Sequence, residues 1–237
     1  MWTWTPNKLV HMDDDADVDS EREAQEDEAA AAEAAEGEAP VVEELDEETR
    51  ARRDAALARV RKLGDPVLRA SAVEVDRFDD SLRNEIERMG LLMSDALGVG
   101  LAATQVGVLH RVLVYRAYAD DPITAMVNPV IESRSDELES AEEGCLSIPG
   151  VHVEVERPAR VCVRARDGFG EEIRIEAEGL QARVIQHEVD HLDGILILDR
   201  ISREARREAM RSLRETREGV TAETKPKRAV ASETSPA

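Results

Sequence analysis

The chain has 237 residues and a formal net charge of −21 at pH 7. This length allows one domain of ordinary size plus tails, and 42% apolar residues suffice for a core. Two cysteines exclude a disulfide framework, and no apolar run reaches the roughly 20 residues of a membrane span. The N-terminus also lacks a secretory signal. We therefore expect a cytoplasmic protein with no membrane or DNA partner.

The acidity is concentrated at the N-terminus. Residues 1–50 contain 18 acidic and three basic residues, a net of −15 out of the total of −21. From Asp13 onward this segment is mostly Asp, Glu and Ala, which cannot bury enough surface to offset its ordering entropy. We predict a disordered leader over 1–54, a folded domain over 55–218 and a disordered tail over 219–237. A solubilising leader is the simpler interpretation, and a partner-binding arm is the alternative.

The first half of the expected domain begins with a helix. Asp79 or Asp80 can cap it, and it runs to about Leu97, with Gly98 as the stop. Its core residues recur at helical spacing and are Leu82, Ile86, Met89 and Met93. The small residues that follow do not complete a dinucleotide-binding fingerprint, because Ala103 stands at the third glycine position.

Alternating apolar residues then predict strands. The first two span Arg111–Ala117 and Ala125–Ile131, and the acidic stretch Glu132–Ala141 is interpreted as a connection. Three further strands alternate around Val151–Val155, Val161–Ala165 and Ile173–Ala177. This pattern indicates an antiparallel sheet.

From Leu180 to Leu192 the apolar period becomes helical, with Gly194 as the stop. Ile195–Leu198 is expected to form a last strand, and Ser202 to cap a helix that ends near Glu218. The predicted fold class is α+β, with antiparallel sheets packed around a central helix and with an N-terminal and a C-terminal helix.

The central helix carries an H-E-x-x-H arrangement. His187 and His191 lie one helical turn apart on the same face, so two imidazoles can bind one divalent metal. Glu188 is offset from both, so it can flank an open metal position and handle a proton. The chain has only five histidines, so this spacing would arise by chance about one time in a hundred. We interpret this part of the helix as carrying a metal-binding site.

The third metal ligand must come from elsewhere, because Ile197 stands where one protease class has a third histidine. Cys145 is the best candidate, since it lies in a polar, turn-like stretch after Gly144. Cys162 alternates with valines on a strand and is interpreted as a small buried hydrophobe.

Three stretches together resemble the signature motifs of bacterial peptide deformylase, in the order and spacing of that family. They are Gly98-Val99-Gly100-Leu101-Ala102-Ala103-Thr104-Gln105, Glu143-Gly144-Cys145-Leu146-Ser147 and Gln186-His187-Glu188-Val189-Asp190-His191. The resemblance covers roughly residues 55–218. It implies a metal-dependent hydrolase that removes the formyl group from N-formylmethionyl nascent peptides and releases formate.

The resemblance also implies roles for single residues. Cys145, His187 and His191 would bind the metal, and Glu188 would be the general acid and base for attack by metal-bound hydroxide. The Gln105 side chain and the backbone N–H of Leu146 would hold the oxyanion. The implied native metal is Fe²⁺, for which Zn²⁺, Ni²⁺ or Co²⁺ can substitute.

For the substrate, the resemblance implies that Gly100 pairs with the peptide backbone. The methionine pocket would be lined by Val99, Leu180 and Val184, although ordinary core packing is an equal alternative for the last two. Arg157 is expected to pair with Glu143. His152 stands where some relatives have an arginine, which leaves the preferred peptide length open.

A row of arginines on the last helix, Arg203, Arg207, Arg211 and Arg214, suggests contact with the ribosome, where nascent chains are processed. A solvated helix with local acidic partners explains the same pattern.

Two other functions remain open from the sequence. A protease could use Glu208 or Glu215 as its third ligand, but it would leave Cys145 and Gln105 unexplained. A catalytically inactive metal-binding or ribosome-associated module would not need Glu188, because structural metal sites use a fourth protein ligand instead of a base.

Overall fold

The computed structural model describes residues 45–223, with side chains to residue 215. The expected leader therefore lies largely outside the described residues, as does most of the expected tail. The described part contains two antiparallel sheets. The larger has the order β1-β2-β3-β6-β7, and its strands are β1 (Gly100–Ala102), β2 (Val112–Tyr115), β3 (Thr124–Arg134), β6 (Arg160–Arg166) and β7 (Glu172–Glu178). The smaller pairs β4 (Leu138–Cys145) with β5 (Ile148–Pro158).

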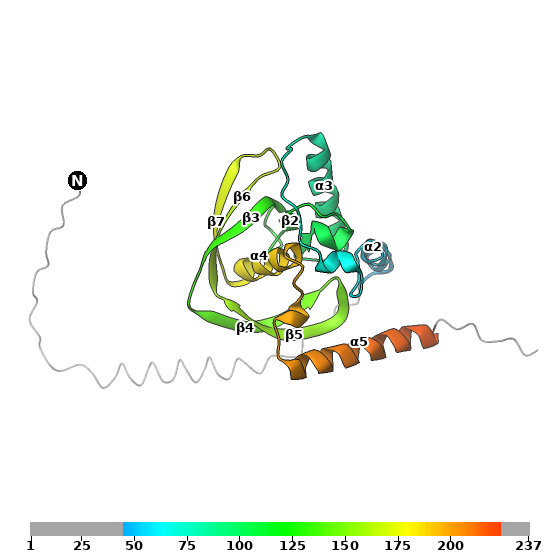
Figure 1. Cartoon of the computed structure of the whole chain (residues 1–237). Coiled ribbons are helices and arrows are strands. Elements are labelled where there is room, and N and C mark those ends of the chain that lie inside the picture. Colours follow the sequence, from blue (N-terminus) through cyan, green and yellow to red (C-terminus); the bar gives the residue numbers. More distant parts are fainter. Residues whose placement is uncertain (1–44, 224–237) are drawn as a thin grey trace, which may run out of the picture. The chain divides into compact units, whose positions relative to one another are not determined.

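Helix α4 (Gly179–Leu192) lies between the two sheets, as Figure 1 shows. Its apolar residues pack against the larger sheet. Ile185 and Leu192 have no exposed surface, and they share a core cluster with Leu113, Met126 and Val163. Burial of this kind contributes about 1.5–3 kcal/mol for each large aliphatic side chain. The histidine helix is thus fixed by the core on one side, and its opposite side faces β4 and β5.

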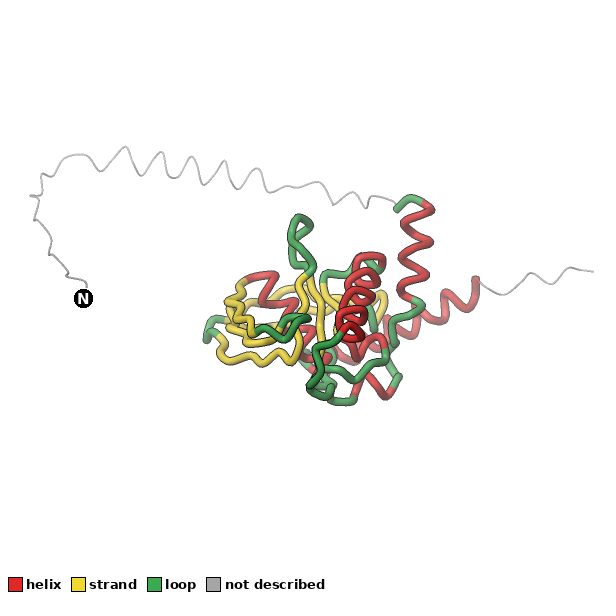
Figure 2. Tube along the Cα trace, turned by 90° about the horizontal axis from the view of Figure 1, so that it is seen from above, coloured by secondary structure: helices red, strands yellow, loops and turns green. Residues whose placement is uncertain are grey.

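The other helices surround this arrangement. Helix α3 (Asp80–Asp95) is capped by the Asp79 carboxylate, which accepts hydrogen bonds from the backbone of Ser81 and Leu82. Helix α2 (Glu47–Leu57) packs beside α3, and α5 (Arg203–Glu223) packs against β5. Figure 2 shows the strands grouped together, with α2 and α3 beside them. Three short 3-10 helices complete the fold: η1 (Pro66–Arg69), η2 (Ala103–Val106) and η3 (Ile197–Asp199).

The predicted fold class is confirmed, and so is the helix that Asp79 caps. Its stop differs in detail, because Leu97 and not Gly98 has the left-handed backbone, with φ of 56°. Gly194 does end the α4 segment with φ of +73°. Ser202 accepts a hydrogen bond from the backbone N–H of Ala205 at the start of α5.

The prediction of a connection over Glu132–Ala141 was wrong. Residues 132–134 belong to β3, and β4 begins at Leu138 and pairs in register with β5, from Leu138 opposite Pro158 to Glu143 opposite Val153. Most side chains of β4 are polar and exposed, and its one large apolar residue, Leu138, is exposed too, so its own hydrophobicity gives no strand signal. Pairing with β5 is what makes this segment a strand.

The predicted strand Ile195–Leu198 was also wrong. Leu196, Ile197 and Leu198 are all buried, and Ile197 and Leu198 lie in η3. The Asp199 carboxylate accepts a hydrogen bond from the Leu196 backbone at 2.9 Å and closes a turn. A short, continuous apolar run cannot distinguish a strand from such a turn.

At the N-terminal side, α2 begins at Glu47, eight residues before the expected start of the folded domain. Asp46 caps it, and Ala56 is buried in the core. In the described part of the chain, no helix is both long enough and apolar enough to cross a membrane.

Candidate metal centre and its cleft

Cys145, His187 and His191 meet at one point between α4 and the end of β4. Each offers one ligand atom, and the three atoms lie within 4.8 Å of one another. Cys145 Sγ is 3.2 Å from His191 Nε2. The two imidazole rings lie with their centres 5.0 Å apart. The helical spacing of the histidines and the β4–β5 turn therefore bring one sulfur and two nitrogens together.

The pKa shifts of Cys145 and His187 favour a thiolate, which is the form that binds a metal ion. Burial by itself raises the pKa of the Cys145 thiol, but the neighbouring imidazoles of His191 and His187 lower it well below its usual value. Burial lowers the pKa of His187, whereas its hydrogen bonds with Cys145 and Glu143 raise it well above the usual value. A thiolate next to a protonated imidazole can exchange that proton for a metal ion, because metal binding releases protons from its ligands.

Glu143 fixes the orientation of His187. Its Oε2 lies 2.9 Å from His187 Nδ1, and a carboxylate can only accept a hydrogen bond, so Nδ1 carries the hydrogen. Nε2 is then the nitrogen with a lone pair for a metal. Metal-binding histidines commonly have such a carboxylate partner, which sets the tautomer and makes the ligand more basic.

Glu143 is itself held by two arginines. Arg157 donates to both of its carboxylate oxygens, at 2.6 and 2.9 Å, and Arg183 donates to Oε1 at 2.8 Å. The expected pair between Arg157 and Glu143 is confirmed. Burial tends to raise the pKa of Glu143, but the hydrogen bonds from His187 and Arg157 lower it to about 2. Its contribution to stability is therefore complete above about pH 4.5, the usual pKa, and is lost as the pH falls towards 2.

Arg157 continues the network along the same face of α4. Its Nη1 donates to Asp190 Oδ2 at 2.8 Å, and Arg200 also pairs with the Asp190 carboxylate. Arg157 and Asp190 are 4% and 7% exposed. Removing one member would leave a buried charge without compensation, which typically costs about 3–5 kcal/mol. The network thus ties β4, β5, α4 and the segment before α5 together behind the ligands.

Glu188 points into the cleft beside the ligands. It is 4% exposed, and its Oε2 has no hydrogen-bond partner among the described residues. Burial raises the pKa of its carboxyl group. A buried carboxyl with a raised pKa and a free oxygen is suited to taking up and returning a proton.

Gln105 and Leu146 lie beside the three ligand atoms. Gln105 Oε1 accepts a hydrogen bond from the Ala102 backbone at 2.8 Å, which directs Nε2 towards Ser147 Oγ at 3.3 Å and Cys145 Sγ at 3.9 Å. Leu146 follows Cys145 directly, and its carbonyl accepts from Lys62 Nζ at 2.9 Å. An amide donor and a backbone segment are thus held beside the three ligand atoms.

A cavity of about 370 Å³ opens onto the centre. All of the expected site residues line it except His191, which lies behind it and is 1% exposed. Gly100 is in close contact with Glu188, because a Cβ on Gly100 would lie 2.4 Å from Glu188 Oε1. Val184 is buried, whereas Val99 and Leu180 are 48% and 42% exposed at the cavity wall. The structure therefore brings the four expected substrate-binding residues to one cleft.

The donor set fits a metal with a catalytic coordination. One thiolate and two imidazoles give three protein ligands, and a structural zinc site would have four. The free oxygen of Glu188 lies in the same cleft, and among the described residues the group has no fourth ligand.

Several residues of the site had no assigned role in the sequence analysis. Asp190 and Arg200 extend the ionic network, Ser147 contacts Gln105, and Arg53 and Leu57 line the cavity from α2. Asp190 and Ser147 stand in the quoted motifs, which was the signal that could have found them. No local pattern joins Arg200 or Arg53 to the site.

Cys145→Ala should abolish stoichiometric metal binding, because it removes the only sulfur of the ligand group. We expect metal affinity to fall by more than about 100-fold, beyond the effect of losing an outer hydrogen bond. Metal content per chain, measured by mass spectrometry after dialysis, checks this. Cys162→Ala is the matched control, since Cys162 is buried in β6 outside the group and should retain one metal. Equal metal content in both variants would contradict the assignment.

Glu143→Gln should weaken metal binding without removing a ligand. It keeps the size of the side chain but deprives His187 of its anionic acceptor, so we expect affinity to fall about 10- to 100-fold. Competition with a chromophoric chelator measures this. Glu142→Gln on the same strand is the control, because Glu142 is exposed and does not contact a ligand. A loss of the same size in the control would show that only the overall charge matters.

Comparison with known proteins agrees with this geometry. The family model described as Polypeptide deformylase matches residues 57–207. A peptide deformylase of Parafrankia sp. is 44% identical over 156 residues, which are 66% of this chain and 85% of that protein. One from Thermosynechococcus vestitus is 49% identical over 146 residues, 60% of this chain and 78% of that protein.

A solved structure shares the fold. The crystal structure of a peptide deformylase from Legionella pneumophila is 40% identical and has a TM-score of 0.65. The match covers 70% of this chain and 98% of that one. Residues 57–207, which match the family model, contain both sheets, α3, α4 and every residue of the candidate centre. The chain therefore belongs to the polypeptide deformylase family.

Proposed function

We propose that the chain removes the formyl group from the N-terminal formylmethionine of nascent peptides and releases formate. The observation that carries this proposal is the Cys145, His187 and His191 group with the buried Glu188 beside it, in a cleft of a deformylase-family fold. A divalent metal bound there would polarise the formyl carbonyl and lower the pKa of water from about 15.7 towards about 7.

Glu188 is proposed as the general base and then the general acid. Its raised pKa and free Oε2 support this role, because the carboxyl must accept a proton from water and return it to the leaving methionine nitrogen. Glu188 also sits against Gly100, which leaves no room for a side chain at that position. The carboxylate is thereby kept close to the strand that we expect to pair with the peptide.

Gln105 and Leu146 are proposed as the oxyanion donors. The Gln105 amide is aimed by its bond from Ala102, and it does not have to reorient when charge develops on the formyl oxygen. A donor of this kind is typically worth about 2.7–4 kcal/mol in the transition state. The backbone N–H of Leu146 would be the second donor, held by the bond between its own carbonyl and Lys62.

The methionine side chain is proposed to occupy the apolar part of the cavity, between Val99, Leu180 and Val184. A flexible thioether needs only such an apolar surface. The proposed native metal is Fe²⁺, with Zn²⁺, Ni²⁺ or Co²⁺ as substitutes. A mixed sulfur and nitrogen set accepts all four ions, and the Cys145 thiolate would make the site sensitive to oxidation.

The two alternative functions receive less support. Within the described residues, the ligand group consists of Cys145, His187 and His191, and it includes neither Glu208 nor Glu215, which are exposed on α5. A protease that used one of these glutamates would leave Cys145 unexplained. An inactive module would leave the buried, unpaired oxygen of Glu188 unexplained.

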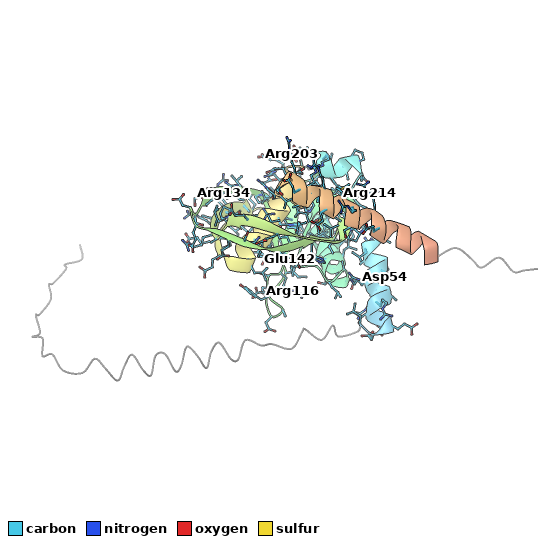
Figure 3. All side chains as sticks on the ribbon, turned by 90° about the horizontal axis from the view of Figure 1, so that it is seen from below. Asp54, Arg116, Arg134, Glu142, Arg203 and Arg214 are labelled. Carbon is cyan, nitrogen blue, oxygen red and sulfur yellow. The ribbon has the colours of Figure 1, made fainter. Side chains whose placement is uncertain are left out.

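We further propose that α5 contacts ribosomal RNA. Ala209 and Leu213 are buried, whereas the four arginines of the row are exposed. Figure 3 shows Arg203 at the start of α5 and Arg214 further along it. Arg207 reaches Glu204 only at 4.0 Å, on the surface, where such a pair contributes little. A row of cations of this kind suits a phosphate backbone.

Reversing the charge of Arg203, Arg207 and Arg211 to Glu should abolish co-sedimentation with ribosomes at low salt and leave folding unchanged. Wild-type binding should weaken steeply as salt rises, because counterions are released. The matched control reverses three exposed arginines elsewhere, Arg52, Arg59 and Arg88. Wild-type binding that is absent or independent of salt would refute the proposed contact.

Turnover tests the central proposal. Protein prepared without oxygen with Fe²⁺, or reconstituted with Ni²⁺, should release formate from formyl-Met-Ala-Ser. Glu188→Gln should retain the metal and lose about 10²- to 10⁴-fold in kcat, because proton transfer is lost. Glu178→Gln, at an exposed position before α4, is the control and should be unaffected. Metal-loaded wild-type protein that releases no formate would favour the inactive module.

A further inference from the structure

Helix α2 contributes to the cleft although it lies almost wholly before the family segment. The family match begins at residue 57, whereas α2 spans Glu47–Leu57. Arg53 and Leu57 nevertheless line the same cavity as Cys145 and His187. They are four residues apart and therefore share one face of the helix. This wall of the cleft is supplied by a part of the chain that the family match does not include, apart from Leu57.

Core packing and backbone hydrogen bonds to the site hold this wall in position. Ala56 and Val60 are each 4% exposed and belong to the core cluster of α3. Just after α2, the Arg61 backbone N–H donates to the Gln105 carbonyl at 2.7 Å, and the Leu63 N–H donates to the Ser147 carbonyl at 2.9 Å. The chain that follows α2 is thus bonded to both segments that carry the proposed oxyanion donors.

Two arginines line the cavity, and of these only Arg53 lacks a partner among the described residues. It is half-buried, and among the described residues no ion pair or hydrogen bond involves its side chain. Arg183, the other arginine at the cavity, is committed to Glu143 and to the carbonyls of Val155 and Glu139. Figure 3 locates α2 by Asp54, the neighbour of Arg53, and β4 by Glu142. A partly desolvated cation facing a peptide cleft is a binding group for a carboxylate.

We infer that Arg53 recognises an acidic side chain in the peptide downstream of the formylmethionine. This inference rests on the proposed function, because it places a formyl peptide in the cleft. An extended peptide advances about 3.3 Å per residue, so residues two to four leave the centre towards the rim. Leu57 supplies apolar contact one turn from Arg53, and the two together favour an acidic residue with a short aliphatic stem. The chain would therefore process acidic N-terminal sequences faster than their neutral equivalents.

The experiment compares peptides that differ only in charge. Formyl-Met-Ala-Ala-Ala amide is prepared with Asp or with Asn at position two, three or four, and kcat/KM is measured for each pair at low salt. Wild type should prefer Asp at one position by about 2- to 5-fold, as expected for a partly exposed ion pair. The preference should disappear in Arg53→Ala, reverse in Arg53→Glu and diminish at high salt. Arg52→Ala is the matched control, because Arg52 is exposed on the same helix and does not line the cavity.

Binding of fluorescently labelled Asp and Asn peptides is measured in parallel. Equal Asp-to-Asn ratios in wild type and Arg53→Glu, in both turnover and binding, would overturn the inference. A ratio that Arg52→Ala changes as much as Arg53→Ala would overturn it too, since only net charge would then matter. If no peptide is deformylated by any variant but the Asp preference in binding depends on Arg53, the inference holds and the proposed function fails.

Discussion

Glu143 is the buried carboxylate on which the candidate centre depends. It accepts hydrogen bonds from His187 on α4, Arg157 on β5 and Arg183 on α4, so one side chain of β4 connects the smaller sheet to the histidine helix. Burying an ionised carboxylate costs free energy unless such donors surround it. The donors in turn are directed by it. The orientation of the first histidine ligand is therefore set by a strand whose own sequence looks like an acidic connection.

The same network explains why the centre can be both charged and rigid. Arg157 joins Glu143 to Asp190, and Asp190 also pairs with Arg200 just before α5. Glu143, Arg157 and Asp190 are each less than 10% exposed, so their charges compensate one another where water is nearly excluded, whereas Arg200 lies at the edge of the network. Low polarisability of the surroundings strengthens these bonds and makes any single loss costly. Glu188 lies outside this network, which leaves its carboxylate available for the proposed proton transfer.

The cleft combines an inner part and an outer part. The inner part has Gly100, Gln105 and Leu146 around the ligands. The outer part includes Arg53, which precedes the match to the family model, and Leu57, with which that match begins. Backbone hydrogen bonds between residues 61–63 and the inner segments hold the two parts together. The outer wall of the cleft is therefore positioned by the same segments that surround the candidate centre.

The sequence by itself determined the candidate site residues of α4 and most of the α-helices. His187, Glu188 and His191 follow from helical spacing, and the alternating valines around Val161 predicted a strand because both periodicities are local properties of the backbone. Cys145 could be nominated as the third ligand, but only the fold brings its sulfur to 3.2 Å from His191. Only the tertiary structure shows that β4 is a strand and that η3 is a helical turn. It also shows that Asp190 pairs with Arg157 and Arg200, and that Arg53 lines the cleft. Each of these depends on partners distant in the chain, and local sequence carries no record of which distant group a charge or an apolar run will meet.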